Sequence, residues 1–229
     1  QLPAQLSMKG HGGTGDILED VSKAVEIVKS WKPPHAHPEA VVPKNVLQHS
    51  QGLVFLHFVK IGAVLSVSEG SGFVIHKLNK GTKDEQWSAP SALTVTAVGL
   101  GLQLGGEMVH NVLSLHSDAA VAAFYDHASF KLGSDIGCAA GPVGARLEKM
   151  DDVGHALSRF PMYAYSYSKG ASVGVAVEGT VLGTNARSNA GLYGKEVTSK
   201  DILSGAEHEI VEKHAVIGEL FSELRHATV

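Results

Sequence analysis

Hydrophobic residues recur along this chain with two periods, every three to four residues near both ends and every second residue in the middle. The first helical pattern runs from Ile17 to Trp31, after a capping-like Asp16. The polar positions between carry charges of both signs, and Pro33-Pro34 ends the pattern. This stretch is predicted to be an amphipathic helix that packs against a core.

The middle of the chain predicts a series of β-strands. Residues 53–67 and 73–78 are β-branched and aromatic, and we predict that they form a hairpin around the SEGSG turn at 68–72. Residues 93–104 alternate Leu and Val with Thr, Gly and Gln, which predicts one or two strands with glycine at points of close approach. Two further strand-like stretches of the same sheet are 108–116 and 129–144.

The next segment alternates again and then changes to helical signals. YAYSYS at 163–168 and ASVGVAVEGTVL at 171–182 are predicted to pair as a second hairpin. AGLYG at 190–194 predicts a helical turn, and Thr198 with Asp201 predicts the cap of another short helix.

The C-terminal residues 207–227 place an apolar stripe from Ile210 to Leu224 on one face of a helix. The stripe suits packing on the sheet, and it also suits partner binding or dimerisation. Helices at both ends of many glycine-rich strands predict an α+β fold. Its core is expected to be a strongly curved antiparallel sheet or a barrel-like sheet.

Composition narrows this picture to one domain. The 229 residues are 44% hydrophobic and show no break between two halves, so we assign 16–229 to a single domain and 1–15 to a flexible lead-in. A formal net charge of −4 argues against a nucleic-acid partner. No apolar run reaches the roughly 20 residues that span a bilayer, and no signal peptide is recognisable, so a cytoplasmic protein is expected.

Few residues carry obvious chemistry. The single cysteine, Cys138, allows no intramolecular disulfide and no multi-cysteine zinc site, and its small neighbours suit a buried position. Thirteen histidines include His35, His37 and His49 close together, but on a proline-rich linker these predict solvated or capping roles and no metal. The glycine-rich strings lack the strand–GxGxxG–helix context, so no nucleotide cofactor is expected.

Three ionisable residues interrupt apolar stretches: Lys60, Glu107 and Glu178. A charge at such a position must be paired, lie at a strand end or line a cavity, because burying it alone costs several kcal/mol. Pairing with one another or with backbone amides and lining a ligand site both remain open, and no acid/base pair is assigned.

The motifs around the second predicted hairpin resemble the signature of the SYLF domain family. That family shows YS-x-SKG-x-x-x-GVSLEG-x-V, then Asn, YG and DIL-x-G. The matching positions here are Tyr165, Ser166, 168–170, 174–179, Val181, Asn189, 193–194, 201–203 and Gly205. Three further blocks match at 41–54, 86–92 and 139–144, and the stretch 98–107 followed by 115–121 looks most like the FYVE-associated branch.

The resemblance implies a non-enzymatic domain that binds anionic lipid or phosphoinositide membranes in membrane trafficking or the cytoskeleton. It also implies actin as a possible partner, a peripheral position at endosomal or plasma membranes, and FYVE or SH3 domains outside this chain. The candidate lipid contacts, expected near one rim of the sheet, are Lys60, Lys169, Arg187, Lys195 and Lys200. Glu107 and Glu178 are expected to be structural polar residues of the core. The alternative is a protein-interaction module that binds actin filaments or self-associates through the C-terminal helix.

Overall fold

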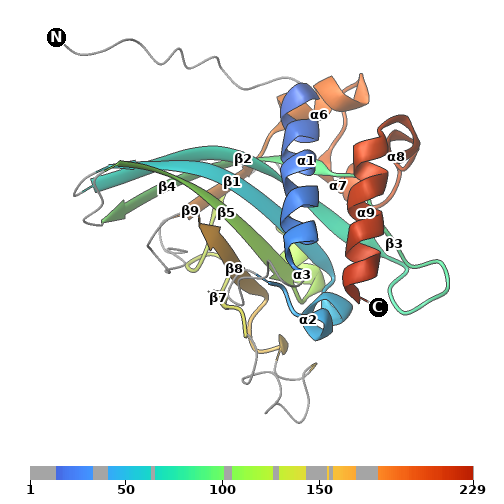
Figure 1. The fold of residues 1–229 in the computed structure, drawn as a ribbon. Coiled ribbons are helices and arrows are strands. Elements are labelled where there is room, and N and C mark those ends of the chain that lie inside the picture. The colour runs from blue at the N-terminus through green and yellow to red at the C-terminus, as the bar shows by residue number, and fades with distance from the viewer. Residues whose placement is uncertain are drawn as a thin grey trace.

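The chain folds around a strongly curled sheet that forms a half-barrel (Figure 1). The computed structural model describes residues 14–32, 41–62, 65–100, 105–125, 129–142, 154, 157–168 and 180–228. The helices are α1 (Thr14–Ser30), α2 (Lys44–His49), α3 (Asp118–Ala122), α6 (Ala186–Tyr193), α7 (Ser199–Leu203), α8 (Glu209–Lys213) and α9 (Ala215–Thr228). The strands are β1 (Gly52–Gly62), β2 (Leu65–Leu78), β3 (Gln86–Trp87), β4 (Ser91–Leu100), β5 (Gly105–Leu115), β6 (Phe130–Lys131), β7 (Cys138–Ala140), β8 (Met162–Ser168) and β9 (Thr180–Thr184). The predicted α+β class and curved sheet are confirmed.

The strand order is β6-β9-β4-β2-β1-β5-β8-β7, and β3 pairs with β2 off this path. Neighbouring strands are antiparallel except for β7 and β8, which run parallel. Long central strands and short edge strands leave little open backbone at the sides of the sheet.

Each face of the sheet is covered by a different set of elements. Successive side chains of a strand point to opposite faces, so Phe55 packs on the helix side and Val54 on the other side. On the helix side Phe55 stacks on Phe73, with ring centroids 5.1 Å apart. On the other side Phe124, just beyond α3, closes a second apolar cluster. The half-barrel is therefore buried on both faces over much of its length.

Helices α1 and α9 lie side by side on the helix face (Figure 1). Lys29 of α1 reaches Glu219 of α9 at 2.8 Å, and Lys32 reaches Glu223 at 2.6 Å. The apolar stripe of the C-terminal segment is buried beneath them, at Ile217, Leu220, Phe221 and Leu224. The packing interpretation of this stripe is thus confirmed, but the predicted single helix divides at His214, whose extended backbone separates α8 from α9. Self-association through it would require α9 to leave the core.

The structure differs from both predicted hairpins. In the first hairpin the chain reverses between Gly62 and Leu65, so SEGSG lies inside β2 and forms no turn. Gly70 and Gly72 suit this position because a Cβ there would overlap the carbonyl oxygens of His57 and Phe55 on the neighbouring strand. The glycines therefore permit close strand pairing.

The second predicted hairpin is wrong for the described residues. Strand β8 pairs with β5 and β7, whereas β9 pairs with β4 and β6 on the other side of the sheet. Residues 169–179, which connect them in sequence, lie outside the described residues. Alternation along the chain identifies strands but not their partners, because pairing is decided across the whole sheet.

Candidate functional site

The signature segment after β9 folds into two short helices whose ends are set by local side chains. Asn185 caps α6, its side-chain oxygen accepting from the backbone N–H of Ser188 at 3.0 Å. Gly194 ends α6 in the left-handed conformation, with φ of 69°. Thr198 caps α7 by accepting from the backbone N–H of Asp201 at 3.1 Å. The predicted helical turn and the predicted cap are both confirmed.

Buried polar side chains fix these helices to β4. The Asn189 side chain, fully buried, accepts from the backbone N–H of Ala92 at 2.8 Å and donates to the Ser91 hydroxyl at 3.3 Å. Ser91 in turn donates to Ser199 of α7 at 2.8 Å. The Tyr193 hydroxyl donates to the Pro90 carbonyl at 2.8 Å, and burial raises the pKa of that tyrosine. These signature residues therefore anchor the segment and hold the neighbouring exposed side chains in place.

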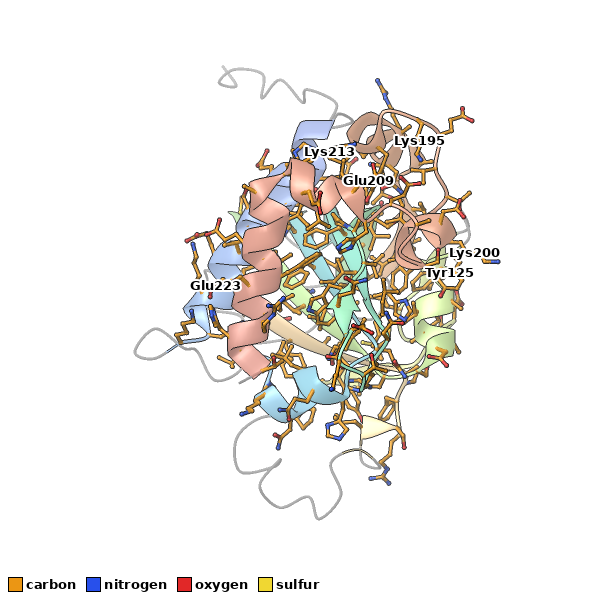
Figure 2. All side chains as sticks on the ribbon, turned by 90° about the vertical axis from the view of Figure 1, so that its right-hand side faces the viewer. Tyr125, Lys195, Lys200, Glu209, Lys213 and Glu223 are labelled. Carbon is orange, nitrogen blue, oxygen red and sulfur yellow. The ribbon has the colours of Figure 1, made fainter. Side chains whose placement is uncertain are left out.

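The exposed side chains of this segment include three of the predicted basic residues. Arg187 and Lys200 are exposed, and neither forms an ion pair with any residue that the structure describes. Lys195 is held by Glu207 at 2.8 Å, and this hydrogen bond raises the pKa of Lys195. Figure 2 shows Lys195 and Lys200 pointing outward from the domain. We call the exposed side of α6, α7 and their connection the α6–α7 surface.

A hollow of about 540 Å³ opens on the α6–α7 surface. Its lining residues are Ala186, Arg187, Ala190, Glu196, Val197, Thr198 and Asp201. Of its two carboxylates, Asp201 already accepts a hydrogen bond from the Thr198 hydroxyl at 2.6 Å and lies in the first turn of α7. The other carboxylate, Glu196, is exposed, and Arg187 and the neighbouring Lys200 are the cations of this surface without an ion pair among the described residues.

The five predicted lipid contacts do not form one cluster among the described residues. Lys60 belongs to β1, near the strand ends that project beyond the helices in Figure 1, whereas the other described candidates belong to the α6–α7 surface. The strand register places the backbone of Lys60 opposite that of Glu107. Lys169 and Glu178 lie outside the described residues.

The projecting strands also carry an apolar pair that sequence reasoning missed. Val59 and Met108 lie opposite each other in β1 and β5, and their side chains are 40% and 51% exposed. Their strand pattern is that of a buried sheet. Val59 and Met108 are exposed because α1 does not reach over them. The sequence around these two residues carries no signal of where α1 lies on the sheet.

A second missed feature is a histidine pair under α1. The Nδ1 atoms of His57 and His110 are 2.7 Å apart, and His57 Nε2 lies 3.2 Å from the backbone oxygen of Asp20. Burial, reinforced by His110 and Lys23, lowers the pKa of His57 to about 3. Burial also raises the pKa of the Asp20 carboxyl, against hydrogen bonds from Ser71 and Lys23. His57 is therefore a buried, neutral contact between α1 and the sheet.

The cysteine and the histidine that the structure describes among the remaining candidates show no sign of a catalytic or metal-binding role. Cys138 is half-buried, and burial raises the pKa of its thiol to about 11, which leaves it unreactive at neutral pH. His49 is exposed with Nδ1 2.7 Å from the Asn45 carbonyl, while His35 and His37 lie outside the described residues. No group of three potential ligands gathers for a metal within the described part of the chain. Nor does any described helix have the length and apolar character needed to cross a membrane.

A family model and several known proteins that resemble this chain point to the same family. A family model described as Ysc84, Las17-binding protein actin regulator, matches residues 96–227. The chain is 36% identical over 191 residues to an SH3 domain-containing protein of Schizosaccharomyces pombe and 34% identical over 191 residues to Protein YSC84 of Saccharomyces cerevisiae. It is 30% identical over 192 residues to the human SH3 domain-containing YSC84-like protein 1.

These alignments cover most of this chain but only part of each relative. They include 82%, 82% and 83% of the chain, against 43%, 40% and 54% of the fission yeast, budding yeast and human proteins. The chain thus spans about half the length of the curated relatives that it matches.

Proposed function

This chain belongs to the Ysc84 (SYLF) family, and on that premise we propose that it is a non-enzymatic domain of the actin cytoskeleton that attaches peripherally to anionic membranes. Its lipid ligand is a phosphoinositide-containing bilayer, at the endosomal or plasma membrane. The observation that carries the membrane part is the pair Arg187 and Lys200, which are exposed and without an ion pair among the described residues. The relatives' names support an SH3 domain elsewhere in the protein.

Arg187 and Lys200 differ from most described lysines on or beside the helices. Those are already paired, as in Lys29–Glu219, Lys32–Glu223 and Lys195–Glu207. A phosphate that approaches the α6–α7 surface can bind Arg187 and Lys200 without breaking an ion pair between these cations and a described carboxylate. Each base near an anionic bilayer adds roughly 1 kcal/mol of attraction. With a chain net charge of −4, attraction must be local, and the buried contacts of Asn189 and Tyr193 hold the helices that carry Arg187 and Lys200 in place.

Liposome flotation tests the membrane proposal. The chain should float with phosphoinositide-containing vesicles and not with neutral ones. Arg187→Glu combined with Lys200→Glu should lower the affinity by more than about tenfold, because two attractive charges become repulsive.

A matched control changes charge by the same amount at the opposite end of the domain. Lys44 of α2 and Lys83 of the β2–β3 loop are exposed there (Figure 1), and Lys44→Glu with Lys83→Glu should change affinity less than about threefold. Equal and negligible flotation with both kinds of vesicle would overturn the proposal. Equal losses in both double variants would mean a non-specific charge effect.

Actin binding is a second candidate function, favoured by the family's description as actin regulators. The chain should pellet with actin filaments at micromolar concentrations and remain in the supernatant without them. If a folded sample, shown by cooperative thermal melting, fails to pellet with the filaments, this function is contradicted. The membrane proposal would not be affected by that result.

A further inference from the structure

A second hollow, of about 430 Å³, lies between the β2–β3 region and the two C-terminal helices, on the side of the molecule that faces the viewer in Figure 2. Its lining residues are Lys77, Glu85, Gln86, Trp87, His208, Val211, Gly218, Phe221, Ser222, Arg225 and Thr228. The volume is typical of a pocket for a small ligand or a short piece of a peptide. We call it the Trp87–Arg225 pocket, and it shares no lining residue with the α6–α7 surface.

A glycine near the start of α9 lies in the wall of this pocket. Gly218 lies four residues into the helix, where glycine costs about 1 kcal/mol relative to alanine. It is not among the described glycines with positive φ, and a Cβ built on it meets no atom within 4 Å. Neither backbone conformation nor close approach therefore requires glycine here. The space beside Gly218 in the pocket wall is open.

The walls of the pocket are aromatic. Trp87 and Phe221 each keep 9% of their surface exposed, and both line the hollow. Lys77 lies behind them, 5% exposed, with Nζ 5.0 Å from the centre of the Trp87 ring and donating to the Leu47 carbonyl at 2.8 Å. Glu85 lies 3.6 Å from the same ammonium. This part of the wall is aromatic, and the Lys77 ammonium, paired with Glu85, lies behind it.

The polar groups of the pocket leave positive charge without a partner. Arg225 is exposed on α9, and its guanidinium forms no ion pair with a described residue. Nδ1 of His208 is buried and has no hydrogen-bond partner among the described residues. Two cations, Lys77 and Arg225, face one carboxylate, Glu85, so the lining keeps about one net positive charge.

We propose that the Trp87–Arg225 pocket binds a peptide segment in which a carboxylate adjoins an apolar side chain. The carboxylate pairs with the Arg225 guanidinium, which offers a planar fork of donors for it. The apolar side chain lies against Trp87 and Phe221 and occupies the space beside Gly218. One net positive charge matches a single carboxylate better than a multiply charged phosphoinositide headgroup. The proposal is independent of the membrane function, since it uses a different surface.

A matched pair of small probes tests this assignment on the 229-residue chain. N-acetylphenylalanine carries the carboxylate and an aromatic side chain, and N-acetylphenylalanine amide has nearly the same shape without the charge. Nitrogen-15 NMR titration should show saturable shifts at the Trp87 indole and the Gly218 amide, with a Kd on the order of 1 mM for the acid. The amide should bind at least about tenfold more weakly, because the ion pair is lost.

Three variants locate the site. Gly218→Leu fills the pocket and should abolish the shifts, while Gly218→Ala, which adds one methyl to open space, should keep Kd within about threefold. Arg225→Gln should weaken the acid about tenfold and leave the amide unchanged. The Gly218→Leu protein should still float with phosphoinositide vesicles, which separates this site from the membrane surface.

The opposite outcomes are equally specific. Absence of shifts with the acid up to about ten times the expected Kd would overturn the proposal. Equal binding of acid and amide would refute carboxylate recognition. Unchanged binding by folded Gly218→Leu and Arg225→Gln proteins would place the probe elsewhere and refute the pocket.

Discussion

Leu220→Asp is expected to unfold the domain rather than to separate a dimer. Leu220 is fully buried in the cluster between α9, α1 and the helix face of the sheet. The substitution would place an unpaired carboxylate there and remove a large apolar side chain. Each change costs several kcal/mol, and their sum is comparable with the whole stability of a typical domain, about 5–15 kcal/mol.

Far-ultraviolet circular dichroism during a thermal scan measures this effect. Ser222→Asp is the matched control, because it adds the same charge to the exposed face of the same helix and should shift stability by no more than about 0.5 kcal/mol. A Leu220→Asp protein that melts like the wild type but changes its association state would show that α9 serves an interface and does not complete the core.

Acidification is expected to destabilise the domain by about 4 kcal/mol between pH 8 and pH 5. Burial lowers the pKa of His57 to about 3 and that of His116 to about 4, from the ordinary 6.5. A histidine with a lowered folded-state pKa keeps the fold fully stable above pH 6.5. Its contribution is lost as the pH falls towards the folded value, because the unfolded chain takes up the proton first. Each histidine accounts for about 2 kcal/mol at pH 5.

Urea denaturation at several pH values measures this slope. The raised pKa of Asp20 acts in the opposite direction at lower pH, since a protonated carboxyl is easier to keep buried. His116→Gln should remove about half of the slope. A free energy of unfolding that stays constant from pH 8 to pH 5 would contradict the buried, neutral state of both histidines.

The local elements of this fold can be predicted from the sequence because their signals are local. The periodicity from Ile17 to Trp31 gives α1, and Thr198 with Asp201 gives the start of α7. Glycines such as Gly70 let neighbouring backbones of the sheet approach closely. The same glycines led to the wrong position for the first turn, because glycine is typical both of turns and of tightly paired strands.

Long-range arrangement was not predictable in the same way. Strands β8 and β9 lie near opposite edges of the sheet. Their sequences do not show this, since each alternates like a strand of a hairpin. The role of Asn189 as a buried link to Ala92 depends on a contact between residues 97 positions apart in sequence. The basic candidates were chosen by type, and only the structure separates the paired Lys195 from Arg187 and Lys200.

Hydrogen–deuterium exchange on phosphoinositide-containing vesicles tests the membrane proposal most directly, because it reports where the lipid contacts the chain. The proposal predicts that slowed exchange concentrates in α6 and α7, residues 186–203, and that Arg187→Glu with Lys200→Glu removes it. Slowed exchange confined to the projecting ends of β1 and β5, or no difference between phosphoinositide and neutral vesicles, would contradict the assignment of the α6–α7 surface.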